Sequence, residues 1–311
     1  MNYLVIGEPC VDVIHKMNNE ILHSYGGILY SLITMSVLAK KDDKVIPVMN
    51  LGEDEFENIT NILKKYPNID LSGIQKCGHP TRKVNLYYNL YNSDKKARLE
   101  QSTEPTYEIT FDWIKNFLPA ADAILINMIS GVDISLETLK KVRAKFKGFI
   151  HIDIHNIVME MDAEGHRSHR AIPDWKEWCS NSDTVQMNEF EAATLTEDKK
   201  NEYAIAEEIL LKEDSTVKGF VITRGKMGVS GFVKKEKKYG EEKFLDVDKH
   251  DLSSIENPHF KDSTGCGDVF AASFTIDYST GKDFEKAVHF ANRKASFKSS
   301  LDGIDELIKL R

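Results

Sequence analysis

The stretch that decides the fold is Asp262-Ser263-Thr264-Gly265-Cys266-Gly267-Asp268-Val269-Phe270, which runs straight into the apolar residues 271–276. Two glycines two positions apart let the backbone turn tightly and present bare N–H groups. At the start of a helix, such groups and the helix dipole form a site for an anion. Asp268 falls beside that site, where a carboxylate can accept a proton from a substrate hydroxyl. The pattern fits phosphoryl transfer to an alcohol, although residues 262–264 would also serve as an ordinary helix cap.

The composition is that of an ordinary globular protein and excludes several classes. The 311 residues carry a net charge of −8, with 41% hydrophobic and 29% charged side chains, unlike a disordered or fibrous chain. No apolar run approaches the roughly 18 residues of a membrane span, and the N-terminus lacks the pattern of a signal peptide. An acidic chain without Lys or Arg blocks is not expected to bind nucleic acid. The four cysteines form no C-x-x-C pair, which disfavours zinc or disulfides. We expect a cytoplasmic enzyme.

Strands and helices alternate along most of the chain. Strands are predicted at residues 3–6, 45–49, 123–126, 149–154, 184–187 and 219–223, and helices at 29–37, 53–65, 135–146 and after the glycine turn. Such alternation is typical of a parallel sheet covered by helices. Residues 155–180 have no stable periodicity, so no element is predicted there. We expect one α/β domain, because no linker divides the chain.

A different pattern lies between residues 80 and 103. Val84, Leu86, Tyr88 and Leu90 alternate with largely polar neighbours, and this period of two indicates a half-buried strand. Residues 92–94 supply turn chemistry, and residues 97–100 can return as a partner strand. We interpret the pair as a small flap that stands off the main sheet.

Residues 262–274, DSTGCGDVFAASF, closely resemble the signature D-T-x-G-A-G-D of the ribokinase-like (PfkB) carbohydrate kinase family. The resemblance implies that Asp268 is the catalytic base and that the backbone of Gly265, Cys266 and Gly267 forms the anion hole. Cys266 replaces the usual alanine, one small residue for another. The resemblance also implies a single kinase domain over residues 1–311. Its fold would be a three-layer α/β/α ribokinase-like fold with a mostly parallel central sheet and a small β-strand lid from about residues 13–26 and 80–103.

Further motifs follow in the family's order. Asn188-Glu189-Phe190-Glu191 resembles the family's N-x-x-E motif, which implies that Glu191 holds a magnesium–phosphate network through water; the same residues could simply cap a helix. Residues 219–228, GFVITRGKMG, resemble the T-x-G-x-x-G segment at the ATP site. They are not a Walker A loop, because Met227 stands where Ser or Thr is required. The residues that the resemblance assigns to ATP are Asn188, Thr223, Gly225, Gly228 and Asn292.

On the acceptor side, Asp12 stands at the family position whose carboxylate accepts hydrogen bonds from sugar hydroxyls. Gly26-Gly27 matches the family's diglycine, which lets the backbone approach the acceptor. Ser31 stands where the family usually has Asn, and bulkier side chains precede it, so the substrate-binding pocket differs from that for ribose or fructose. The acceptor implied is a sugar or related polyol, with a nucleoside as the alternative. A phosphorylated acceptor would need an added cation, for which the candidates are Arg82, Lys83 and Arg98.

The resemblance implies ATP and Mg²⁺ as cofactors, a K⁺ site near Asp262 and Thr264, and a homodimer formed through the lid. Two alternatives remain open. A metal-dependent hydrolase could use His151, Asp153 and His155, which alternate along one strand and suit Zn²⁺ or Mn²⁺. A sugar- or nucleotide-binding sensor would keep the fold without turnover.

Overall fold

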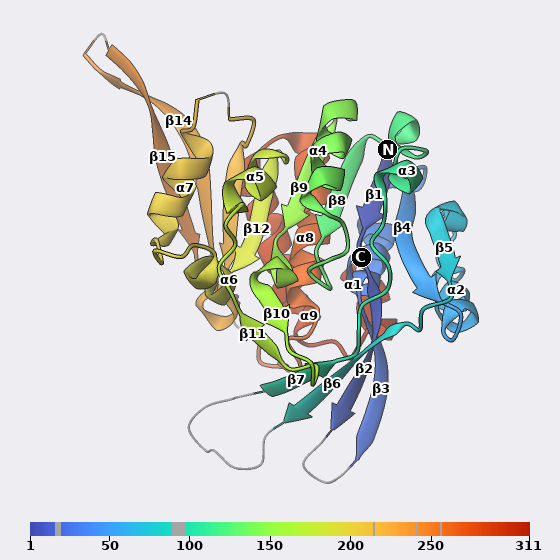
Figure 1. Cartoon of the computed structure of the whole chain (residues 1–311). Helices are drawn as coiled ribbons and strands as arrows, with labels where there is room; N and C mark the ends of the chain where they lie inside the picture. The colour runs from blue at the N-terminus through green and yellow to red at the C-terminus, as the bar shows by residue number, and fades with distance from the viewer. Residues whose placement is uncertain (16–19, 89–97, 214, 241, 256) are drawn as a thin grey trace.

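Within the described part of the chain, nine strands form one sheet through the middle of the molecule (Figure 1). The computed structural model describes residues 1–311 apart from 16–19, 89–97, 214, 241 and 256. From edge to edge the strands are β15 (Glu242–Leu252), β14 (Val229–Tyr239), β13 (Gly219–Thr223), β12 (Thr184–Asn188), β9 (Phe149–Asp153), β8 (Ala123–Asn127), β1 (Asn2–Ile6), β4 (Lys44–Gly52) and β5 (Ile74–Cys77). Strands β13 to β5 pair in parallel, whereas β13–β14 and β14–β15 pair antiparallel. The predicted mostly parallel sheet is confirmed.

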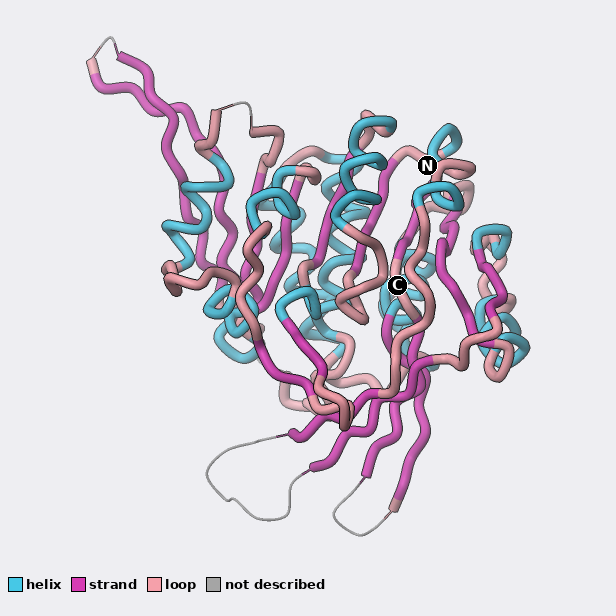
Figure 2. The backbone as a smooth tube through the Cα atoms, viewed as in Figure 1, coloured by secondary structure: helices cyan, strands magenta, loops and turns pink. Residues whose placement is uncertain are grey.

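Helices cover both faces of this sheet (Figure 2). One face carries α3 (Phe111–Ile114), α4 (Leu136–Lys145), α5 (Trp175–Ser180), α6 (Glu189–Thr194) and α7 (Glu202–Leu210). The other carries α1 (Ile28–Leu38), α2 (Phe56–Leu63), α8 (Cys266–Gly281) and α9 (Phe284–Lys298). A separate hydrophobic core fills each interface, and this explains why the central strands are apolar on both faces. The three-layer prediction is confirmed.

A second, four-stranded sheet stands off the lower edge of the main sheet in Figure 1. Its strands, in order, are β3 (Ile21–Gly27), β2 (Pro9–His15), β6 (Arg82–Tyr88) and β7 (Arg98–Ser102). This small sheet is the predicted lid, and β6 and β7 pair antiparallel as the alternating pattern predicts. Its first segment begins at Pro9, four residues before the predicted start. The turn predicted at residues 92–94 lies outside the described residues.

The stretch without a sequence pattern, residues 155–180, supports the lid. Strands β10 (Met159–Met161) and β11 (Arg167–His169) form a hairpin, and its turn packs against β7. The amide of Ser102 donates to the Gly165 carbonyl oxygen at 2.9 Å, and Gln101 Nε2 donates to the Glu164 carbonyl oxygen at 2.7 Å. The hairpin therefore fastens one edge of the lid to the main body.

The carboxyl ends of β8, β9, β12 and β13 meet at the edge of the main sheet that faces the small sheet (Figure 1). Each of these strands ends in a polar residue, and these are Asn127, Asp153, Asn188 and Thr223. Ligands of open α/β sheets bind at this edge, so the fold gathers the polar strand ends where a site is expected. No helix in the described part of the chain has the length and apolar character needed to cross a membrane.

Candidate active site

A glycine turn opens α8 at this edge of the sheet. Gly265 caps the helix with φ +77°, a left-handed conformation that favours glycine. A Cβ at this position would also collide with the ring of Tyr30. Cys266 uses its amide within the turn, because it donates to the Ser263 carbonyl oxygen at 3.1 Å. Gly267 lines the cleft, and a Cβ there would meet open space, so the backbone of Gly267 is open to a ligand.

Asp268 lies in the first turn of α8, at the head of the helix. Its Oδ1 accepts a hydrogen bond from Asn127 Nδ2 at 2.6 Å. Burial raises the pKa of the Asp268 carboxyl, while His155 and Asn127 act in the opposite direction. A carboxylate with a raised pKa is a better proton acceptor near neutral pH. Sequence reasoning missed Asn127; the available signal was its position as a polar residue at the end of a buried strand.

Three carboxylates and one imidazole cluster beside this turn. Asp153 is 4% exposed and Glu191 is 5% exposed, and His155 Nδ1 lies 3.5 Å from Glu191 Oε1. Burial raises the pKa of Asp153 well above its usual value, and the charges of Glu191 and Asp268 add to this effect. Burial opposes protonation of His155, but contact with Glu191 and the nearby acids outweigh it and raise its pKa to about 9. The imidazolium therefore balances part of the cluster's negative charge.

Asn188 and Glu191 form a reciprocal helix cap at the start of α6. The Asn188 side chain accepts from the Glu191 amide at 2.9 Å, and Glu191 Oε2 accepts from the Asn188 amide at 2.7 Å. The alternative that Asn188 and Glu191 cap a helix is therefore confirmed. Glu191 still lines the cleft, and the buried carboxylates around it are the hard oxygen donors that Mg²⁺ prefers. Because the cap already uses both Glu191 oxygens, these residues fit a magnesium ion that is held through water.

The predicted hydrolase triad does not assemble. His151 is fully buried, its Nδ1 lies 2.8 Å from Thr184 Oγ1, and its ring packs on Phe274 of α8. Burial lowers the pKa of His151 to about 3. His151 is therefore a core residue. Among the described residues, one group has the spacing of a metal site, but it is the exposed set Asp162, Glu164 and His166 on the β10–β11 hairpin. The metal-hydrolase alternative is wrong, because α8 covers His151 and separates it from the cleft, where Asp153 and His155 lie.

On the donor side, the cleft continues past the ends of β13 and β15. Gly228 has φ +92°, and its missing side chain leaves room for the backbone after Leu252. Asn292 on α9 donates from Nδ2 to the Ser253 carbonyl oxygen at 3.1 Å. This bond ties α9 to the segment after β15 and fixes one wall of the cleft. Apolar side chains of Val229, Ile255 and Phe260 line the same end.

On the acceptor side, Asp12 belongs to β2 of the lid. It is 7% exposed, and a Cβ on Gly26 of the neighbouring strand would displace the Asp12 carboxylate from this position. Beneath it, Arg82 Nε lies 3.1 Å from Glu8 Oε2, and both side chains are 3% exposed. This buried ion pair, which sequence reasoning did not predict, joins β6 of the lid to the short connection between β1 and β2.

Ser31 does not face the cleft. It is fully buried on α1 and donates to the Asp268 carbonyl oxygen at 3.3 Å. Asn127 Nδ2 lies 3.4 Å from its hydroxyl. The sequence predicts that Ser31 contacts the substrate. At this buried position its side chain cannot reach a ligand in the cleft. Ser31 instead supports Asp268 and Asn127 from behind.

One cleft of about 1,620 Å³ brings most of the predicted residues together. Those that line it are Asp12, Gly27, Asn188, Glu191, Thr223, Gly225, Gly228, Thr264, Gly265, Cys266, Gly267, Asp268 and Asn292. Gly26, Ser31 and Asp262 are not lining residues. The phosphate-type turn, the acid beside it and the lid carboxylate therefore border a single space between the two sheets.

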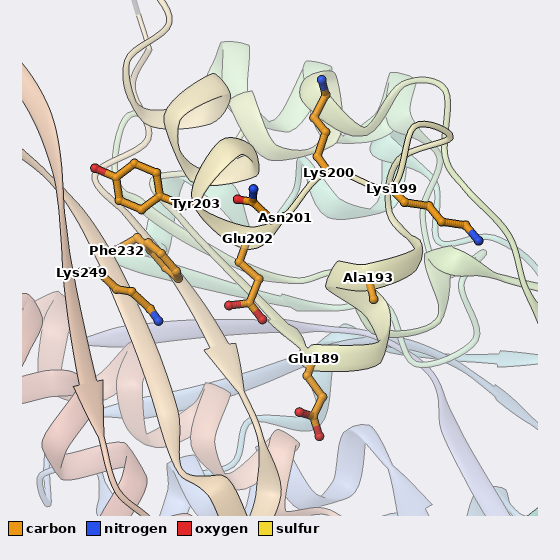
Figure 3. A pocket seen from close by; sticks show the side chains of 9 residues that line it. All are labelled: Glu189, Ala193, Lys199, Lys200, Asn201, Glu202, Tyr203, Phe232 and Lys249. Atoms are coloured by element: carbon orange, nitrogen blue, oxygen red, sulfur yellow. The ribbon is translucent and has the colours of Figure 1, made fainter.

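A second hollow of about 550 Å³ lies between α6, the start of α7 and the strands β14 and β15 (Figure 3). Glu202 points inward there, whereas Lys199 and Lys200 extend away from it. Three of its charged side chains already have partners, since Glu202 pairs with Arg224, Lys200 with Asp198 and Lys249 with Asp251. The described residues that line this hollow include no glycine turn and no buried carboxylate. We therefore assign the active site to the larger cleft.

A covered parallel sheet, a helix-opening glycine turn and a carboxylate beside it define an α/β phosphotransferase that acts on the alcohol group of a small molecule. Residues 130–305, more than half of the chain, match the family described as pfkB family carbohydrate kinase. The chain belongs to the pfkB family of carbohydrate kinases. Comparison with curated protein sequences finds no significant match.

Solved structures with the same fold are similar over almost their whole length. A pyrophosphate-dependent kinase in the ribokinase family is 20% identical with a TM-score of 0.74, covering 97% of this chain and 96% of its own. Ribokinase from Thermotoga maritima is 18% identical with a TM-score of 0.69, covering 99% and 98%. Arabidopsis thaliana ribokinase, in complex with ribose and ATP, is 18% identical with a TM-score of 0.68, covering 99% and 97%. The ribokinase-like fold is therefore confirmed.

Proposed function

We propose that this protein transfers the γ-phosphoryl group of ATP to a hydroxyl of a sugar or related polyol, with Asp268 as the general base. The observation that carries the proposal is the position of Asp268. It lies at the head of α8, in the same cleft as Asp12 on the lid and Thr223 at the end of β13. An acceptor between Asp12 and Asp268 would present a hydroxyl to the base, and a donor along β13 would present its phosphate to the glycine turn.

The residues divide the chemistry between them. Asn127 Nδ2 donates a hydrogen bond to Asp268 Oδ1 at 2.6 Å. The other oxygen, Oδ2, would therefore accept the proton of the acceptor hydroxyl as the hydroxyl oxygen attacks phosphorus. The Gly267 amide and the positive end of α8 would stabilise the charge on the transferred phosphoryl oxygens. Magnesium, when bound near Glu191 through water, would neutralise donor phosphate charge. The lid would exclude water from the reacting groups.

The donor end of the cleft favours a nucleotide over pyrophosphate. Relatives of this fold include a pyrophosphate-dependent kinase and ribokinases complexed with ATP, so the fold is compatible with both. Pyrophosphate has no apolar part. Here the cleft runs on past the turn to Val229, Ile255 and Phe260, and these apolar side chains suit the flat face of an adenine ring.

The acceptor class rests on the lid. Asp12 is a short carboxylate that can accept hydrogen bonds from two neighbouring hydroxyls, which sugars and cyclic polyols provide. Relatives of the same fold are complexed with ribose and with myo-inositol. Both ligands are neutral and carry several hydroxyl groups. A nucleoside would also offer ribose hydroxyls to Asp12, and it is the second acceptor class to test.

The test is Mg²⁺-dependent phosphoryl transfer to a panel of sugars, polyols, sugar phosphates, sugar acids and nucleosides, with ATP and pyrophosphate each as the donor. We expect ADP release with at least one acceptor and no turnover with pyrophosphate; Asp268→Asn is the control for contaminating kinases. Turnover with pyrophosphate alone would overturn the donor assignment. ATP or sugar binding without any turnover across the panel would favour a sensor. Failure to bind ATP would refute the nucleotide site.

A further inference from the structure

The molecule holds a lysine with no exposed surface beside the glycine turn. Lys298 is the last residue of α9 and is 0% exposed. Its Nζ lies 3.3 Å from the Leu301 carbonyl oxygen and 5.4 Å from the centre of the Tyr30 ring. None of the described acidic side chains forms an ion pair with it. A buried ammonium without an acidic partner costs free energy, so the position calls for an explanation.

Contacts connect this ammonium to the turn. The ring of Tyr30 lies under Lys298 Nζ on one side and fills the space where a Cβ of Gly265 would be. The charge of Lys298 also acts on the thiol of Cys266 in the turn. Burial raises the pKa of this thiol to about 11, and the positive charge of Lys298 works against that rise. Tyr30 therefore separates a fixed positive charge from the backbone that would receive phosphate.

The K⁺ site that the family resemblance implies near Asp262 and Thr264 fits this structure poorly. Asp262 Oδ1 already accepts from the Thr264 amide at 3.0 Å and from the Thr264 hydroxyl at 2.9 Å. The Ser299 carbonyl oxygen accepts from the amides of Lys261 and Asp262, at 2.8 and 3.2 Å. These oxygens are committed to the turn, and a second cation beside the turn would be repelled by the charge of Lys298.

We propose that Lys298 is a built-in cation that supports the glycine turn and takes the place of an exchangeable monovalent cation. This inference rests on the proposed kinase function. The C-terminal end of α9 and the face of Tyr30 both favour a positive charge, but neither is a full counter-ion. The missing negative charge arrives when donor phosphate binds at the turn. Lys298 does not touch the reacting atoms, so it is a positioning residue that acts through Tyr30 and the turn.

The first test uses the unaltered protein. Turnover with ATP and the best acceptor is measured in choline chloride and then with K⁺, Na⁺ or NH₄⁺ added at constant ionic strength. We expect kcat to stay within about twofold across all of these salts, because the required charge is covalently attached. Strong activation by K⁺ would overturn the proposal, and this measurement needs no variant to fold.

The second test compares Lys298→Met, Lys298→Ala and Lys298→Arg with Lys286→Met, an exposed position on the same helix. We expect Lys298→Met to lower kcat about tenfold or more, since a unit charge near the turn contributes on this scale, and Lys286→Met to leave it unchanged. Methylammonium or K⁺ should restore activity to Lys298→Ala, which leaves a cavity. Lys298→Arg should retain more activity than Lys298→Met.

Thermal unfolding of each variant separates a folding defect from a charge effect. A folded Lys298→Met variant with the original kcat, or a folded Lys298→Ala variant that no cation rescues, would refute the proposed role. If the unaltered protein shows no turnover with any acceptor, the proposed function fails before Lys298 is tested. The two failures are therefore distinguishable.

Discussion

Replacing Asp268 with Asn removes the proposed base and keeps the shape of the site. The carboxylate accepts from Asn127 Nδ2 at 2.6 Å through Oδ1, and the amide oxygen of an Asn can take over that bond. The amide nitrogen then stands where Oδ2 is assigned to the hydroxyl proton, and it cannot accept one. The substitution therefore tests proton transfer in particular.

The magnitude follows from this geometry. General base catalysis contributes about 100- to 10,000-fold, which corresponds to about 2.7–5.5 kcal/mol of activation free energy. We expect kcat to fall in this range while the dissociation constant for ATP stays unchanged, because the donor end of the cleft is untouched. The folded state of the Asp268→Asn variant should be at least as stable as that of the unaltered protein. Burial raises the pKa of Asp268, so its ionised form destabilises the folded state above that folded-state pKa.

The assay combines steady-state ADP release with thermal unfolding of the same samples. Asp268→Asn should unfold at the same or a higher temperature than the unaltered protein at pH 8, and the difference should shrink as pH falls through the folded-state pKa. A variant that folds, binds ATP and retains more than about a tenth of the original kcat would refute Asp268 as the base.

Three further substitutions test the supports of the site. Asn127→Ala removes a hydrogen bond that lowers the pKa of Asp268, so the acid limb of the pH profile of kcat/KM should move to higher pH; an unmoved limb would exclude this coupling. Gly265→Ala meets a positive φ and an aromatic ring, and should cost at least about 1–3 kcal/mol in urea unfolding, with loss of turnover. Arg82→Met leaves Glu8 buried without its partner and should cost about 3–5 kcal/mol, whereas the exposed Lys115→Met should cost less than about 1 kcal/mol.

The sequence predicts the main sheet and the glycine turn because both depend on local information. Apolar strands followed by amphipathic helices specify a covered parallel sheet, and Gly265 and Gly267 specify the turn before α8. Asp268 could be found from the same stretch. The contact of Asp268 with Asn127 could not be predicted, because Asn127 lies far away in the chain and meets Asp268 only when β8 and α8 pack together.

Other wrong predictions concern residues whose strand or helix is predicted correctly, but whose burial depends on which element packs over them. His151 and Asp153 do share one face of β9, yet α8 packs over His151 and leaves Asp153 at the open strand end. Ser31 follows the diglycine as predicted, but its helix turns it into the core. The β10–β11 hairpin has too few residues per strand to produce a periodic pattern.

Asp12 and Asp268 belong to different parts of the molecule, one to a lid strand and the other to a helix of the main body. If both carboxylates bind the acceptor, as proposed, then the acceptor itself joins the two sheets. ATP alone would touch only the main body and would leave the lid without this link. Selection of the acceptor and protection of ATP from hydrolysis would thus be a single event, and a compound that fails to reach Asp12 would neither react nor promote wasteful loss of the donor.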